Sequence, residues 1–122
     1  MERTRGECLK EKREIRVAIP TRENGGMDDV VSDVFGRAPT FTIIDIEGKE
    51  VKTVKVVQNP AASYQHGAGP IAVKTLADQD VKAVVAGEFG PGVTTLLDHF
   101  NVTKVEVKRG THVPDAIKQF LE

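Results

Sequence analysis

Two of the three histidines lie in glycine-rich loops, where an imidazole could reach a ligand. His66 is followed directly by glycine, and His112 comes two residues after Gly110. Because neutral imidazole is a common ligand for iron and copper, His66 and His112 are the candidate metal ligands. His66 could instead order its loop, and His112 also suits the first turn of a helix. His99 falls late in an expected helix and is better explained as a partner of the helix C-terminus.

Short glycine-rich stretches recur along the chain, and two of them precede expected helices. Glycine lets the backbone approach a ligand closely, and the positive end of a helix dipole favours an anion. A Walker loop and a dinucleotide fingerprint are both absent, and glycine at a strand-to-helix turn often serves packing alone. Arg37 would add positive charge, although it could equally pair with Asp29 or Asp33. The candidate cofactor-binding residues are Gly36, Arg37, Gly67, Gly69, Gly90 and Gly92.

The pattern of apolar residues predicts five strands and three helices. We expect strands over residues 15–19 (ended by Pro20), 41–46, 51–57, 81–86 and 102–107, and helices that start after Gly69 and Gly92 and over residues 113–121. A hairpin start followed by alternating helices and strands predicts an α/β fold with helices on both faces of a five-stranded mixed sheet. Right-handed crossovers favour the strand order 3-2-1-4-5, with strand two antiparallel to the others.

This topology directs most of the loops to one edge of the sheet. Open α/β sheets bind ligands beyond the carboxyl ends of their strands, where the strand order reverses, which here is between strands one and four. We therefore expect a shared pocket at that edge, lined by residues 24–26, 35–39, 59–70, 87–92 and 110–112.

Length and composition narrow the class of protein. The 122 residues fit one domain over residues 15–122, preceded by a charged extension over residues 1–14. The only cysteine, Cys8, excludes an intrachain disulfide and a cluster held by several thiolates of one chain. A net charge of −1 offers no field that would attract nucleic acid or a membrane surface. Without a signal peptide or a membrane-spanning apolar run, the protein is expected to be cytoplasmic.

Four segments, in this order and spacing, resemble the dinitrogenase iron–molybdenum cofactor biosynthesis family. They are residues 32–41 (SDVFGRAPTF), 59–60 (NP), 66–69 (HGAG) and 86–92 (AGEFGPG). The family includes small stand-alone proteins, nitrogenase cofactor carriers and the orange protein, which holds a molybdenum–copper–sulfide cluster. The resemblance covers residues 15–121 and implies a three-layer ribonuclease H-like fold. Many carriers of the family have a histidine directly before the Phe-Gly-Arg-Ala segment, whereas this chain has Val34.

The resemblance implies a non-catalytic binding or carrier protein for a metal–sulfur cofactor of the Fe–S, Mo–Fe–S or Mo–Cu–S type. A protein that donates or accepts the cluster would be its partner. A metal-free regulatory or anion-binding module is the alternative. A nuclease-type enzyme is disfavoured, because two-metal hydrolysis needs several converging carboxylates. The first and fourth expected strands carry none, and Asp45 stands alone on the second, where a surface position is expected.

Overall fold

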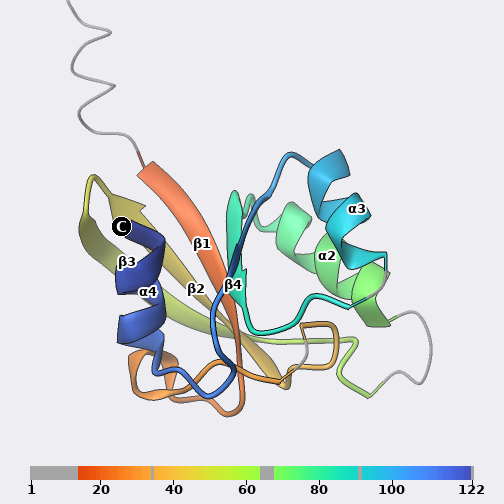
Figure 1. The fold of residues 1–122 in the computed structure, drawn as a ribbon, viewed down its shortest axis with the longest axis horizontal. Coiled ribbons are helices and arrows are strands. Elements are labelled where there is room, and N and C mark those ends of the chain that lie inside the picture. The colour runs from red at the N-terminus through yellow and green to blue at the C-terminus, as the bar shows by residue number, and fades with distance from the viewer. Residues whose placement is uncertain (1–13, 34, 64–67, 91, 122) are drawn as a thin grey trace, which may run out of the picture.

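Five strands form a single mixed sheet in the order β3-β2-β1-β4-β5 (Figure 1). In this computed structural model, residues 14–33, 35–63, 68–90 and 92–121 are described. β2 is antiparallel to both β1 and β3, whereas β1, β4 and β5 run parallel. The predicted α/β fold, strand order and direction of strand two are therefore confirmed. The strands are β1 (Glu14–Thr21), β2 (Thr40–Glu47), β3 (Glu50–Gln58), β4 (Ala83–Ala86) and β5 (Thr103–Glu106).

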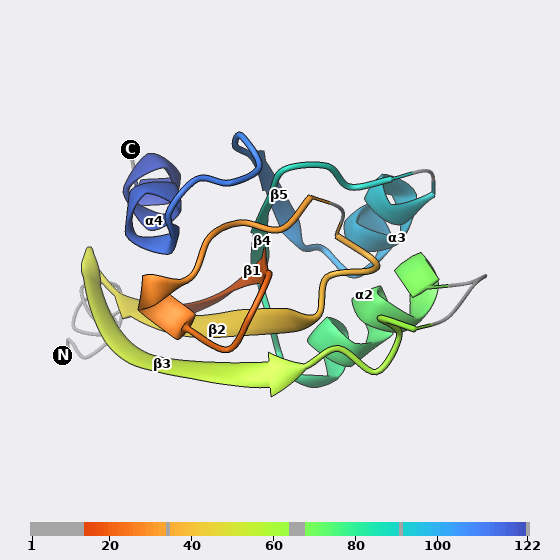
Figure 2. The ribbon, with the colours of Figure 1, turned by 90° about the horizontal axis from the view of Figure 1, so that it is seen from below.

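Helices cover both faces of the sheet and give it three layers (Figure 2). α2 (Ala68–Asp78) and α3 (Val93–His99) pack on one face, and α4 (Val113–Leu121) packs on the other. Alternation along β1 supplies both cores, because Ala18 faces α2 and α3 while Val17 and Ile19 face α4. None of the helices in the described ranges is long and apolar enough to cross a bilayer.

The prediction that Pro20 ends the first strand is wrong, since β1 continues to Thr21. Proline lacks an amide hydrogen, so it is tolerated in a strand only where the ladder needs no donor from it. β4 pairs with β1 only at Val17 and Ala18, and Pro20 lies beyond that pairing while still opposite Phe41 of β2. Its carbonyl oxygen accepts a hydrogen bond of 2.8 Å from the amide of Ser32.

The other element boundaries lie within two residues of the predicted ones. α2 already includes Ala68 and Gly69, so this helix does not start after Gly69 as predicted. α3 does start directly after Gly92, and the closing helix spans the predicted residues 113–121.

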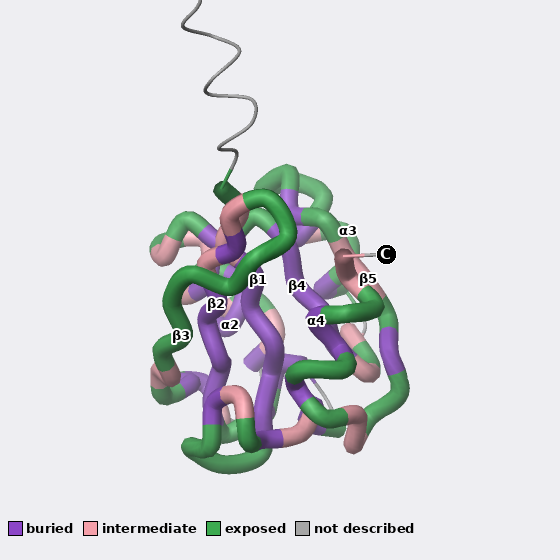
Figure 3. The backbone as a smooth tube through the Cα atoms, turned by 90° about the vertical axis from the view of Figure 1, so that its left-hand side faces the viewer, coloured by how far each residue is buried: buried purple, intermediate pink, exposed green. Residues whose placement is uncertain are grey.

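The two ends of the described chain lie at the edge of the sheet opposite the glycine-rich loops (Figure 1). β1 starts at Glu14 on that edge, and α4 ends there at Leu121. The central strands are buried, whereas β3 is exposed along most of its length (Figure 3). The loops that follow β1 and β4 therefore share the far edge, as the topology predicts.

Candidate functional site

The loop before β2 is fastened to the loop after β4. The amide of Phe35 donates a 2.9 Å hydrogen bond to the carbonyl oxygen of Glu88. The Phe35 ring is fully buried, with its centroid 5.4 Å from that of Phe41 and 6.2 Å from that of Phe89. Aromatic rings at such spacings contribute more than their buried area alone. The two loops therefore form one packed unit at the carboxyl edge of the sheet.

The backbones of Gly36 and Gly69 approach each other so closely that a side chain on Gly36 would be tightly crowded. A Cβ atom placed on Gly36 would lie 3.0 Å from both Cα and N of Gly69. A Cβ atom on Gly69 would lie 2.7 Å from Cγ2 of Val93, at the start of α3. We call residues 35–38, 68–69, 88–90 and 92–93, which surround this contact, the glycine junction. Its segments contain five of the six predicted cofactor-binding positions, namely Gly36, Arg37, Gly69, Gly90 and Gly92.

Gly90 and Gly92 differ from the other two glycines because they border open space. Their φ angles are +87° and +76°, and nothing lies within 4 Å of a Cβ atom built on either residue. Positive φ is costly for residues that carry a side chain. Among the described residues, the junction thus has a packed part at Gly36 and Gly69 and an open part at Gly90 and Gly92.

Asn59 holds the loop of residues 36–38 in place, and the sequence interpretation missed this role. Its side-chain amide donates to the carbonyl oxygens of Gly36 at 3.0 Å and Ala38 at 2.8 Å. Its side-chain oxygen accepts from the amide of Ala61 at 3.0 Å, and Asn59 is buried. The available signal was an asparagine directly after a strand and before a proline, a position where asparagine side chains often bond the local backbone.

Arg37, in the glycine junction, is exposed. The two carboxylates that the sequence offered as its ion-pair partners are engaged elsewhere. Asp33 accepts from Arg22 at 2.8 Å, and the Asp29 carboxylate accepts from backbone amides, including that of Glu23 at 2.8 Å. Both carboxylates therefore have other donors in the structure.

Residues 24–26 do not join the glycine junction, which corrects the predicted lining of the pocket. Residues Gly26–Asp28 form a 3-10 helix, η1, that packs over β3. A Cβ atom on Gly26 would lie 3.6 Å from side-chain atoms of both Val54 and Val56. These valines stand opposite Ile44 and Thr42, on the face of the sheet that α4 covers. The turn after β1 thus packs on the face of the sheet that α4 covers, and not at the glycine junction.

His112 also lies on the α4 side of the edge. It forms an antiparallel bridge with Val30, and its carbonyl oxygen accepts from the amide of Ala116 at 3.0 Å as α4 begins. Its side chain is exposed, and its role as a metal ligand stays a prediction. His66 and Gly67 fall outside the described residues, as does Val34. In the ranges that the structure describes, no three His, Cys, Asp or Glu side chains gather to hold a metal ion.

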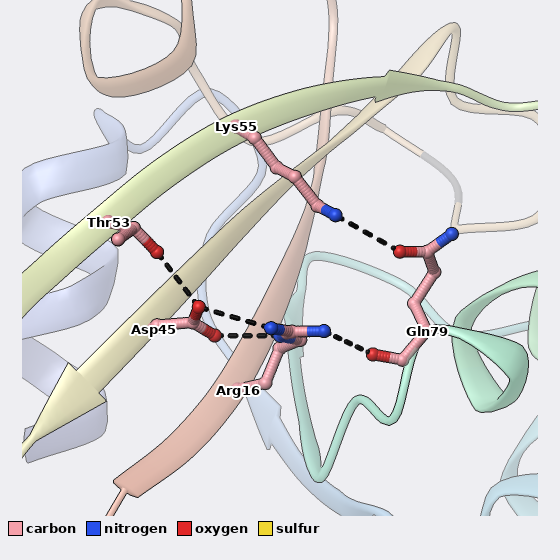
Figure 4. A network of polar contacts seen from close by, with 5 residues as sticks. All are labelled: Arg16, Asp45, Thr53, Lys55 and Gln79. Carbon is pink, nitrogen blue, oxygen red and sulfur yellow. Dashed lines mark hydrogen bonds and ion pairs between the residues drawn. The ribbon is translucent and has the colours of Figure 1, made fainter.

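A second polar network lies at the opposite edge of the sheet and contains Asp45 (Figure 4). Two nitrogens of Arg16 donate to the two carboxylate oxygens of Asp45, and Thr53 donates a further hydrogen bond of 2.8 Å. Arg16 also donates to the carbonyl oxygen of Gln79 at 2.8 Å. The hydrogen bond from Arg16 lowers the pKa of the Asp45 carboxyl, and Asp45 in turn raises the pKa of Arg16. Asp45 is therefore a partly exposed anion held by an ion pair and a hydrogen bond.

The comparison with known proteins agrees with this architecture. Residues 13–122 match the model of the family described as dinitrogenase iron–molybdenum cofactor. A NifB-like protein from Thermotoga is 34% identical, with 87% of this chain and 86% of the other covered and a TM-score of 0.71. The apo form of the orange protein from Desulfovibrio gigas is 29% identical, with 87% and 86% covered and a TM-score of 0.78.

A relative of unassigned function extends the comparison to an archaeon. An uncharacterised protein from Methanocaldococcus jannaschii is 27% identical over 108 residues, which are 88% of this chain and 86% of the relative. The family match spans the whole sheet and all three helices, and it includes the segments that build the glycine junction. This chain therefore belongs to the dinitrogenase iron–molybdenum cofactor family.

Proposed function

We propose that this protein is a non-catalytic carrier that binds a metal–sulfur cofactor at the glycine junction. Membership of the family and the likeness to the orange protein support the general role in cofactor biosynthesis or delivery. The cofactor, of the Fe–S, Mo–Fe–S or Mo–Cu–S type, is cargo in this proposal. A cluster donor or acceptor protein would exchange it with the carrier in the cytoplasm.

The open part of the glycine junction is the observation that carries the proposal. Gly90 and Gly92 border free space next to a loop whose exposed Arg37 brings a positive charge. Sulfide-rich clusters are anionic, and backbone amides and guanidinium groups suit sulfide and oxyanion acceptors. Gly36 and Gly69 act in packing, which keeps the loops that carry the open part together.

Metal coordination itself would come from His66, with Gly67 in the same loop. The described part of the chain offers no thiolate and no group of three acidic or imidazole ligands. The cluster would therefore be held mainly by charge and hydrogen bonds, with imidazole as the protein ligand to metal. Val34 cannot ligate a metal, so it cannot replace the histidine that related carriers have at that position. His112 is the second candidate, from the neighbouring side of the same edge.

Anaerobic reconstitution tests this function. Purified protein is incubated with iron, molybdate or copper together with sulfide, desalted, and examined by visible absorption and elemental analysis. We expect the wild type to retain metal and sulfide, and His66→Ala to lose most of both. Arg37→Ala should weaken retention roughly tenfold, as loss of one charge partner costs about 1–2 kcal/mol. His99→Ala is the matched control, because α3 ends at His99, away from the junction.

Two results would overturn the proposal in different ways. Full cluster retention by His66→Ala would remove that ligand while leaving the carrier role in place. A wild type free of metal after every reconstitution would instead favour a metal-free regulatory or anion-binding module. The presence of Val34, where related carriers have a histidine, is the observation that favours this second function. Titration with inorganic phosphate or molybdate, followed by amide NMR shifts of residues 88–90, 92 and 93, would then detect the anion.

A further inference from the structure

An apolar groove lies between α4 and the β2–β3 hairpin, far from the glycine junction. Its volume is about 370 Å³. Its apolar lining comes from η1, β3 and α4, namely Met27, Val51, Pro114, Ile117 and Leu121. We call this space the α4 groove. Apolar grooves that stay open on a small domain often mark a surface that another molecule covers.

The charged residues that line the α4 groove are both cations. Lys49 and Lys118 stand at its rim, and both are exposed. Within the described chain, neither ammonium group makes a hydrogen bond or an ion pair. An occupant with carboxylates beside apolar side chains would match both the lining and the charge of the groove.

The groove continues onto β3, which is an edge strand (Figure 2). Val51 and Val54 are 39% and 38% exposed, unusually high for large apolar side chains on a strand. They stand opposite Ile46 and Ile44, so both valines face the side that α4 covers. The outer edge of β3 is not paired with another described strand. An extended segment could therefore add to this edge and place alternate side chains beside the valines.

The charges along β3 indicate whether its free edge pairs with a second copy of this chain or with a different partner. Residues 49–55 contain three lysines and one glutamate, and the ladder is irregular where Lys52 adds an extra residue. Lysines and bulges on an edge strand hinder pairing of that strand with itself. Like charges placed across a strand pair are destabilising, whereas acidic residues opposite these lysines would stabilise the pair.

We propose that β3 and the α4 groove bind an extended acidic segment of a partner protein. Its apolar side chains, at alternate positions, occupy the groove beside Val51, and its carboxylates lie near Lys49 and Lys118. This docking surface is on the opposite face of the sheet from α2 and α3, so a bound partner leaves the glycine junction uncovered.

The direct test uses the fluorescein-labelled peptide acetyl-Glu-Val-Glu-Leu-Glu-Val-Glu-amide and the full-length chain. Fluorescence anisotropy at low ionic strength should show saturable binding that weakens as salt is added. Amide NMR shifts should concentrate on β3 and α4. A peptide with lysine in place of glutamate, and one methylated on alternate backbone nitrogens, should each bind at least roughly tenfold more weakly.

Matched protein variants separate the groove from general charge effects. The double variant K49E/K118E should bind the acidic peptide at least about tenfold more weakly. K74E reverses one such charge at an exposed position of α2, on the opposite face of the sheet, and should bind like the wild type. Both variants change exposed side chains, so circular dichroism should confirm an unaltered fold.

Several outcomes would overturn the proposal. Equal binding of the acidic and basic peptides would remove the charge argument, and shifts confined to other surfaces would remove the site. Concentration-dependent dimerisation through β3 would assign the edge to a second copy. Nuclear Overhauser contacts between residues 1–13 and Val51 in the peptide-free chain would assign the groove to the chain's own N-terminal segment.

Discussion

Arg16 and Asp45 form a two-point ion pair across the first two strands. The Arg16 Nε atom lies 2.7 Å from one carboxylate oxygen of Asp45, and Nη2 lies 3.2 Å from the other. The remaining Nη1 atom reaches the carbonyl oxygen of Gln79, in the turn after α2. The pair therefore ties β1, β2 and one helical layer together at the edge opposite the glycine junction. Side chains of both residues are about one-third exposed, so solvent screens part of the attraction.

The stability that this pair contributes should depend on pH in a defined direction. Because Arg16 lowers the pKa of Asp45 in the folded state, the contribution is present above the ordinary carboxyl value of 3.8. It is lost as the pH falls through the lower folded-state pKa. Asp45→Asn should therefore cost about 1 kcal/mol at neutral pH and almost nothing in strong acid, measured by urea unfolding across pH.

Asp78→Asn is the control for that experiment, because it disrupts the exposed Lys74–Asp78 pair on α2. Pairs of this kind contribute about 0.3–0.5 kcal/mol, so its cost should be small at every pH. A difference between wild type and Asp45→Asn that grew as the pH fell would contradict the assigned ion pair.

The contact between Gly69 and Val93 predicts a compensating pair of substitutions. Gly69→Ala places a methyl group 2.7 Å from Val93 Cγ2 and should destabilise the protein by about 1–3 kcal/mol. Val93→Ala alone should also destabilise it, because it leaves a cavity at a buried position. The double variant should be more stable than the sum of the two costs predicts, as measured by thermal and urea unfolding. Strict additivity would show that the two residues are not in contact.

Replacement of asparagine by aspartate should have very different costs in stability at two loop positions. Asn59 donates to two carbonyl oxygens, so Asn59→Asp would place a buried carboxylate against them and should cost about 2–4 kcal/mol. Exposed Asn24 only accepts a hydrogen bond, from Gln58 at 2.9 Å, and Asn24→Asp keeps that acceptor. Its cost should stay within about 0.5 kcal/mol in the same urea assay.

Hydrogen exchange gives this prediction a local measurement. The amide of Phe35 should lose protection in Asn59→Asp, since the loop that Asn59 fixes is then released. Unchanged protection, together with equal costs for the two substitutions, would contradict the assigned role of Asn59.

Three buried threonines form a chain of hydroxyl groups on the face that α4 covers. Thr42 lies 3.1 Å from Thr21, and Thr21 lies 2.6 Å from Thr40, measured between Oγ1 atoms; Thr40 in turn donates to the carbonyl oxygen of Glu23. Each hydroxyl has a single hydrogen, so donation runs from Thr42 through Thr21 to Thr40. Thr42→Val removes the first donor and leaves the other bonds intact, so it should cost less than about 1 kcal/mol.

Thr40→Val interrupts the same chain at its other end. It leaves the Glu23 carbonyl oxygen without this donor and the buried Thr21 hydroxyl without its acceptor. We expect a cost of about 1–3 kcal/mol by thermal unfolding, clearly larger than for Thr42→Val. The reverse ranking would show that donation runs in the other direction.

The sheet and the closing helix could be predicted because their residues follow a simple period. The closing helix buries Val113, Ala116 and Ile117 on one face, and that spacing is visible in the sequence. Strand order followed from chain order and crossover handedness, and it placed Gly36 and Gly90 at one edge correctly.

The details of the site required long-range contacts that no local pattern contains. Residues 21–39 have no apolar period, and their path depends on distant partners such as the hydrogen bond from Val31 to Thr111. Gly26 was therefore assigned to the wrong layer. The contact of Gly36 with Gly69, and the bonds from Asn59, join residues more than twenty positions apart. The glycines in the sequence indicated that these loops make close backbone contacts, but they did not indicate which segments are in contact.

The positions of the two ends of the described chain make some fusion sites preferable to others. Glu14 and Leu121 both lie at the edge away from the glycine junction (Figure 1). An affinity tag or a surface linker at the N-terminal side should therefore leave the loops around Gly90 accessible. Leu121 lines the α4 groove, so a bulky carboxyl-terminal fusion would shield that groove sterically. Protein immobilised at either end should therefore expose the glycine junction to a solution of cluster. Attachment at the N-terminal side would leave the α4 groove free, whereas a bulky attachment at the carboxyl-terminal side would block it.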